Sequence, residues 1–188
     1  MKRLTALTLF VFICIFACSQ AFAQADVGLK GAGLKIGIVG PEDVDATVGF
    51  AAFADLGQLT PNIMWEMYID YWKQSENLFL GGEFSIRDIT WGSRAKWMFP
   101  VSNPKVRPFA GAGLGMHFIN VQLDIPADLI LGIPAFTLED SSTKVGLDIG
   151  GGVSAAINDK TDFIGELWYG LVTDVNQLTL NVGFLYKL

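Results

Sequence analysis

The segment 178–188 reads LTLNVGFLYKL and ends the sequence. Apolar side chains occupy every second position from Leu178 to Leu188, and the positions between them carry Thr, Asn, Gly, Leu and Lys. Such two-residue alternation is typical of a β-strand whose two faces meet different surroundings. Only Leu185 interrupts the pattern. The segment therefore predicts a strand that is held in a sheet up to its last residue.

The same alternation recurs along the chain, and helical periodicity is scarce. Tight connections are predicted at 57–61, 101–105 and 157–161, whereas a long loop is predicted at 124–142. Short turns at one end and longer loops at the other are typical of an outer-membrane barrel. The sequence thus predicts an all-β fold, an eight-stranded antiparallel up-and-down transmembrane β-barrel. Its predicted strands are 29–39, 46–56, 62–72, 84–99, 106–123, 143–156, 162–172 and 177–188.

Alternation alone does not tell which face of the strands meets lipid. The alternate positions that carry polar residues, which we call the polar phase, do tell it. This phase is rich in glycine, for example at 111, 113 and 115, and a narrow barrel needs small residues inside. It also carries charges of both signs, which suits a closed interior where charges pair. A charge facing lipid at mid-depth costs about 2–4 kcal/mol. The predicted interior charges are Lys35, Asp55, Glu66, Asp70, Arg94, Lys96, Arg107, Lys144, Asp148, Glu166 and Lys187.

Aromatic residues near the ends of the predicted strands support the same orientation. Membrane barrels carry aromatic girdles at both interfaces with water. We expect these girdles to include Trp65, Trp72, Trp97, Phe99, Phe109 and Tyr186.

The amino-terminal segment has the features of a secretory signal peptide. Basic residues at 2–3 precede an apolar run at 4–17, and small residues follow at 21, 23 and 25. We expect cleavage after Ala23, with Ala25 as the alternative, and a barrel domain at 24–188. Cys14 and Cys18 both precede this site, so the mature chain is expected to have no disulfide. The net charge of −6 and the lack of a basic stripe argue against a nucleic-acid partner.

The chain resembles the small outer-membrane β-barrel proteins of Gram-negative bacteria, the OmpA/OmpX/OmpW-like barrels. The resemblance rests on segments 91–118 and 146–157 and on the last strand. It implies a location in the cell outer membrane and contact with the barrel-assembly machinery. The family's terminal assembly signal corresponds here to Asn181, Gly183, Tyr186 and Leu188, where Leu188 replaces the usual terminal phenylalanine.

We therefore expect a non-enzymatic structural or surface-interaction barrel, a monomer without cofactor, metal or catalytic residues. Its expected partners are outer-membrane lipid and lipopolysaccharide. Three alternatives stay open: a small porin or transporter for small or apolar solutes, a lipid A-modifying enzyme that uses His117, and a soluble lipocalin-like barrel. Acidic residues at 42–45 and 139–140 fit a solvated loop or a divalent-cation contact.

Overall fold

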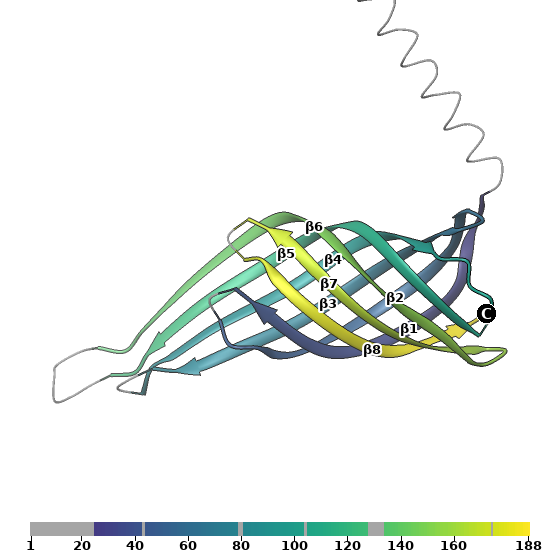
Figure 1. The fold of residues 1–188 in the computed structure, drawn as a ribbon. Helices are drawn as coiled ribbons and strands as arrows, with labels where there is room; N and C mark the ends of the chain where they lie inside the picture. Colours follow the sequence, from purple (N-terminus) through teal and green to yellow (C-terminus); the bar gives the residue numbers. More distant parts are fainter. Residues whose placement is uncertain (1–24, 43, 79–80, 104, 128–133, 174) are drawn as a thin grey trace, which may run out of the picture.

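The computed structural model describes residues 25–42, 44–78, 81–103, 105–127, 134–173 and 175–188. The signal peptide expected at 1–23 lies outside these residues. Within the described ranges, no helix is long and apolar enough to cross a bilayer. The chain folds into strands that follow one another around a ring (Figure 1): β1 Asp26–Pro41, β2 Thr47–Thr60, β3 Ile63–Asn77, β4 Glu83–Met98, β5 Val106–Ile125, β6 Phe136–Asn158, β7 Thr161–Val172 and β8 Gln177–Lys187.

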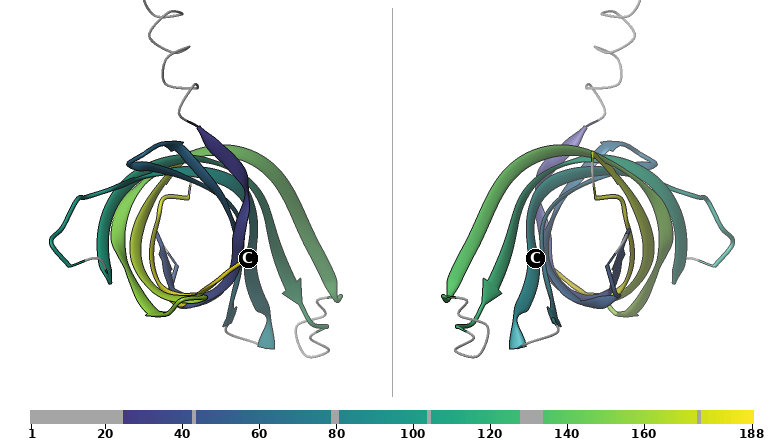
Figure 2. Two further views of the ribbon diagram at one scale, coloured as in Figure 1. Left: turned by 90° about the vertical axis from the view of Figure 1, so that its right-hand side faces the viewer. Right: turned by 90° about the vertical axis from the view of Figure 1, so that its left-hand side faces the viewer.

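The ring is closed, and the predicted eight-stranded antiparallel barrel is confirmed. Each strand pairs with the next, and β8 returns to pair with β1 from Gly31↔Lys187 to Pro41↔Gln177. Viewed along the axis, the strands enclose one interior, and the far ends of β5 and β6 flare to one side (Figure 2). The last strand ends at the end of the barrel where the turns are short (Figure 1). Short turns mark the periplasmic side of such barrels, so the opposite end is extracellular.

Burial follows the predicted alternation along β8. Val182 is 45% exposed on the outside, whereas its neighbour Asn181 is 4% exposed inside. Leu185, which interrupts the pattern, is also only 4% exposed. It packs inside the barrel in an apolar cluster with Phe53, Tyr68 and Ile164. The interruption is therefore an apolar contact within the lumen.

The predicted long loop at 124–142 is wrong at both of its ends, where strand continues through residues 124–125 and 136–142. Strand β5 continues to Ile125 and β6 begins at Phe136, and the two stay paired as far as Ile125↔Phe136. Within β6 the apolar residues move from the inward to the outward alternate positions. The strand as a whole therefore does not show simple alternation. Leu138 lies on the inward phase, whereas Val145 lies on the outward one.

Two aromatic residues predicted for the interfacial girdles lie inside the barrel instead. Trp72 is 1% exposed and Phe109 is 5% exposed. The indole nitrogen of Trp72 donates to Gln177 at 3.0 Å, and the Phe109 ring centroid lies 6.5 Å from that of Trp168. Both residues stand on the inward phase of their strands. Their side chains point inward because of the alternate positions that they occupy, although both residues lie near strand ends.

Candidate functional site

The middle of the barrel is closed by two lysines that share two glutamates. Lys35 Nζ lies 3.0 Å from Glu66 and 2.7 Å from Glu166. Lys96 Nζ lies 2.5 Å from Glu66 and 3.0 Å from Glu166. The four residues come from β1, β3, β4 and β7, and all are buried. Each charge is satisfied from two sides, as a buried ion requires.

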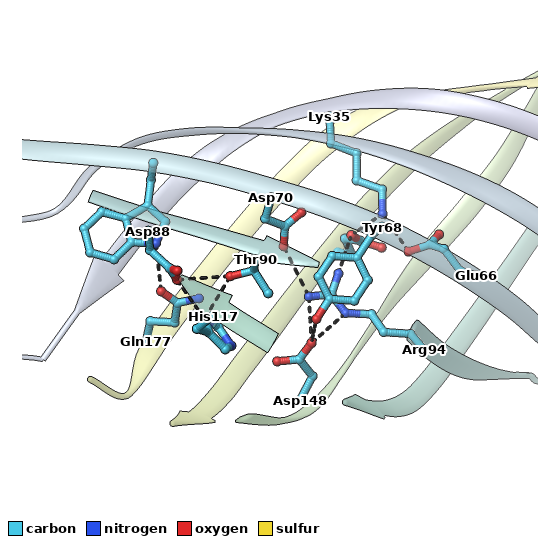
Figure 3. A network of polar contacts seen from close by, with 12 residues as sticks. Lys35, Glu66, Tyr68, Asp70, Asp88, Thr90, Arg94, His117, Asp148 and Gln177 are labelled. Atoms are coloured by element: carbon cyan, nitrogen blue, oxygen red, sulfur yellow. Dashed lines mark hydrogen bonds and ion pairs between the residues drawn. The ribbon is translucent and has the colours of Figure 1, made fainter. Parts of the chain in front are cut away.

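Arg94 extends this network toward the extracellular end, as Figure 3 shows. Its guanidinium lies 3.0 Å from Asp148 and 3.5 Å from Asp70. It also stacks over the rings of Tyr68 and Trp168, with centroid distances of 3.7 and 4.4 Å. The Tyr68 hydroxyl donates to the same Asp148 oxygen. Charges and aromatic rings together fill the lumen, and we call this set, with the two lysines and two glutamates, the central network.

Glycine makes room for the rings of the central network. A Cβ added at Gly92 would stand 2.4 Å from the Tyr68 ring, and one added at Gly150 would stand 2.7 Å from Trp168. Real Cβ atoms do not approach so closely, so a larger residue at either position would force these rings to shift. The glycines of the polar phase thus accommodate large interior side chains.

A second polar group, Asp88, Thr90 and His117, lies nearer the extracellular mouth (Figure 3). His117 Nδ1 lies 2.7 Å from Asp88 and 2.8 Å from the Thr90 hydroxyl, which also donates to Asp88 at 3.0 Å. All three residues are buried, and the other nitrogen of His117 has no hydrogen-bond partner among the described residues. The carboxylate and the hydroxyl therefore contact the same ring nitrogen, Nδ1. The hydroxyl is not placed at Nε2, the nitrogen from which a carboxylate-oriented histidine would activate a nucleophile.

A third group lies at the periplasmic end around Asp162. Its carboxylate lies 2.9 Å from Arg107 and 2.7 Å from Lys187, and it accepts a longer hydrogen bond from Ser154. Asp162 is fully buried, while the two cations are partly exposed. Asp162 and Asp88 are not among the predicted interior charges, although both stand on the inward phase of their strands and are buried.

The remaining predicted interior charges lie outside the central network. Asp55 is buried and accepts the Gly57 backbone N–H at 2.8 Å. Lys144 is half-buried on β6, directly across the ladder from His117.

The extracellular mouth is apolar where the middle of the barrel is charged. A cluster of Val39, Trp72, Ile86 and Ile119 lies above the polar groups. Val44, Phe84, Val121 and Val175 pack against it. The lumen therefore holds two layers of packed side chains, one ionic in the middle and one apolar at the mouth.

Strands β3 to β6 continue beyond this mouth as a sheet, visible at the left of Figure 1. We call it the projecting sheet. Along its outer strand the ladder with β7 begins only at Gly146↔Val172. Residues 136–145 of β6 thus pair with β5 and, within the described part of the chain, with no second strand. On the inward phase near the tip, Leu138 and Phe136 are 59% and 45% exposed.

Two of the predicted assembly-signal residues point into the barrel and two point outward. Asn181 and Gly183 face the lumen, while Tyr186 and Leu188 are exposed. The backbone N–H of Leu188 donates to the Lys30 carbonyl at 2.9 Å, so the closing seam includes the last residue. Recognition of these residues by the assembly machinery stays a prediction.

Comparisons with known proteins agree with this architecture. A family model described as "Outer membrane protein beta-barrel domain" matches residues 9–187. No curated protein sequence matches the chain.

Several solved structures share the fold at low sequence identity. Neisserial surface protein A is 18% identical with a TM-score of 0.60, covering 84% of this chain and 96% of that one. A major outer membrane protein from Thermus thermophilus is 14% identical with a TM-score of 0.58, covering 84% and 99%. Ail of Yersinia pestis, crystallised with the heparin analogue sucrose octasulfate, is 14% identical with a TM-score of 0.55, covering 85% and 100%.

These structural likenesses establish the fold alone, whereas the family match spans nearly the whole chain. Apolar side chains such as Leu114, Val145 and Leu180 are exposed around the outside of the barrel, and we call them the apolar belt. In an outer-membrane protein this belt faces lipid, so the soluble alternative is wrong. The chain belongs to the outer membrane protein beta-barrel domain family and is a protein of the cell outer membrane.

Proposed function

We propose that this protein is a non-enzymatic surface-interaction barrel whose projecting sheet binds an extended segment of a partner protein along β6. The observation that carries the proposal is that the edge of β6 at residues 136–145 pairs with no second strand within the described chain. An exposed strand edge offers a row of backbone N–H and C=O groups, which an added strand can pair. Ser142 stands opposite the mouth residue Ile119, so residues 136–141 of this edge lie beyond the mouth and are open to a partner from outside the cell.

The side chains beside the edge favour one kind of partner. On the inward phase of the projecting sheet, Leu123 stands opposite Leu138 and Ile125 opposite Phe136. A strand added to β6 would continue these rows, and its own inward residues would cover the exposed Leu138 and Phe136. We therefore expect a partner segment with apolar residues at every second position.

The interior supports a role outside the lumen. The central network fills the barrel from wall to wall, and an eight-stranded barrel is only wide enough for side chains. We accordingly expect no stable unitary currents from the protein in planar lipid bilayers. Uniform single-channel currents would favour the transporter alternative instead.

Binding of short synthetic peptides to the full chain in lipid nanodiscs tests the proposal. Peptides with alternating apolar residues should bind and should protect the amides of 137–145 from hydrogen exchange. N-methylation of those peptide nitrogens that face β6 should abolish binding, because it removes the backbone donors.

Two variants on one strand provide a matched comparison. Leu138→Lys on the inward phase should weaken peptide binding about tenfold or more, since it replaces an apolar contact by a charge. Thr137→Lys adds the same charge on the outward phase and should change binding little. Equal effects of the two variants, or binding without protection of 137–145, would contradict the proposal.

A further inference from the structure

The outward face of β3 and β4 changes from apolar to charged residues between two successive pairs of the ladder. Ile69 stands opposite Trp91, and Tyr71 stands opposite Ile89; these side chains are exposed to the lipid. The next outward pair is Lys73↔Arg87, and both cations are exposed. Successive outward residues on a strand are about 7 Å apart. The first charged level above the apolar belt on these strands is therefore a pair of cations.

Two like charges directly opposite each other destabilise a sheet. Within the described residues, the side chains of Lys73 and Arg87 have no ion pair or hydrogen bond; only the Lys73 backbone carbonyl accepts one, from the Thr47 hydroxyl at 2.8 Å. The next outward pair, Ser75↔Ser85, is neutral and supplies no counter-charge. An external anion between the two cations would relieve their repulsion.

At the periplasmic end, in contrast, an exposed lysine has an acidic partner. Lys30 Nζ lies 2.7 Å from the carboxylate of Asp26, so its charge has a partner on the same strand. The unmatched cation pair at the extracellular end is thus not a general property of exposed lysines in this barrel.

We propose that Lys73 and Arg87 bind a phosphate group of lipopolysaccharide in the outer leaflet. The pair lies at the extracellular end of the barrel, at the level where the acyl chains stop and the phosphorylated sugars of this glycolipid begin. Arginine and lysine both bind phosphate by charge-assisted hydrogen bonds, arginine through a planar fork. This proposal rests on the outer-membrane location and is independent of strand binding at β6.

Neighbouring groups limit the site to this level. On the far side of Arg87 stands Asn120, whose amide already donates to Glu139 and Ser141. Farther from the membrane, Glu83 stands opposite Asp124, two carboxylates that repel an anion. The favourable position for phosphate is therefore next to the apolar belt.

The test measures lipid binding by the full chain in neutral detergent micelles, by native mass spectrometry. The probes are bis-phosphorylated lipid A, chemically dephosphorylated lipid A and phosphatidylglycerol. The double variant Lys73→Gln/Arg87→Gln should bind bis-phosphorylated lipid A about fivefold more weakly than the unmodified protein, from two exposed charge contacts. Dephosphorylated lipid A should bind both proteins equally.

The matched control is Lys30→Gln/Lys160→Gln, which removes two exposed positive charges at the periplasmic end. It should leave lipid A binding unchanged. Heat-modifiable migration on gels verifies that each variant is folded. Unchanged lipid A binding in the Lys73→Gln/Arg87→Gln protein would overturn the proposal. An equal loss of phosphatidylglycerol binding would also overturn it, because the site would then recognise anionic lipid in general.

Discussion

The barrel wall and the projecting sheet use the same strands with opposite polarity. Along β5, Leu114 and Phe118 face outward and are exposed, while His117 is buried in the lumen. A few residues later Asn120 is on the outward face, and Val121 packs inward against the mouth cluster. The strand keeps its two-residue period, but the apolar phase moves from outside to inside.

The solvent on the outer face explains this reversal. Within the membrane, lipid surrounds the barrel and selects apolar residues outside, so polar groups gather in the lumen and must pair. Beyond the membrane, water surrounds the sheet and selects polar residues outside, so apolar groups remain for the inner face. The level of the reversal marks the boundary of the bilayer, and the cation pair Lys73↔Arg87 lies just beyond the last apolar outward pair.

Deletions should separate the two regions most strongly. Removing residues 186–188 takes away two of the eleven residue pairs between β8 and β1, together with the predicted assembly-signal residues Tyr186 and Leu188. We expect membrane-inserted protein to fall about tenfold or more, measured by heat-modifiable migration of the membrane fraction. A deletion of three residues between Ile125 and Phe136 should reduce insertion far less. Comparable losses would show that the projecting sheet is also required for assembly.

The central network should be the next most sensitive part. Glu166→Gln removes the charge that faces both Lys35 and Lys96, and breaking a buried ion pair costs about 3–5 kcal/mol. The free energy of unfolding, measured by urea titration in detergent micelles, should fall by that amount. Leu138→Lys in the projecting sheet should change it by less than about 0.5 kcal/mol. A small effect of Glu166→Gln would mean that water or other groups compensate the two lysines.

Glycine substitutions should give a smaller contrast within the barrel itself. In Gly92→Ala the new methyl group would collide with the Tyr68 ring, and overpacking costs about 1–3 kcal/mol. In Gly165→Ala the methyl group meets only ordinary contacts, the nearest at 3.7 Å. The same urea titration should therefore give a lower free energy of unfolding for Gly92→Ala than for Gly165→Ala. Equal stability would indicate that Tyr68 can move aside without loss of its contacts.

Local pattern was sufficient to predict the eight-stranded antiparallel barrel. It was insufficient where the surroundings change along a strand. The start of β6 was missed because Phe136 and Leu138 are apolar on the inward phase, whereas Val145 is apolar on the outward phase. Trp72 was assigned to the lipid interface from its position in the chain, although its phase pointed inward.

The partners within the lumen could not be predicted either. Lys96 meets Glu66 diagonally across the ladder of the consecutive strands β3 and β4, but Glu166 comes from β7, and only the closed ring brings it to Lys96. The group of Asp88, Thr90 and His117 has a weak local signal, since Asp88 and Thr90 stand two residues apart on the inward phase. Its link to His117 on the neighbouring strand depends on the register of β4 and β5.

The seam between β1 and β8 has a consequence for biosynthesis. The first strand to leave the ribosome finds its second neighbour only when the last strand has been made. A product of interrupted translation therefore keeps an open edge on β1, and contacts this distant in sequence form slowly. The seam acts as a check on completeness, because a chain that stops before β8 has no partner for the free edge of β1.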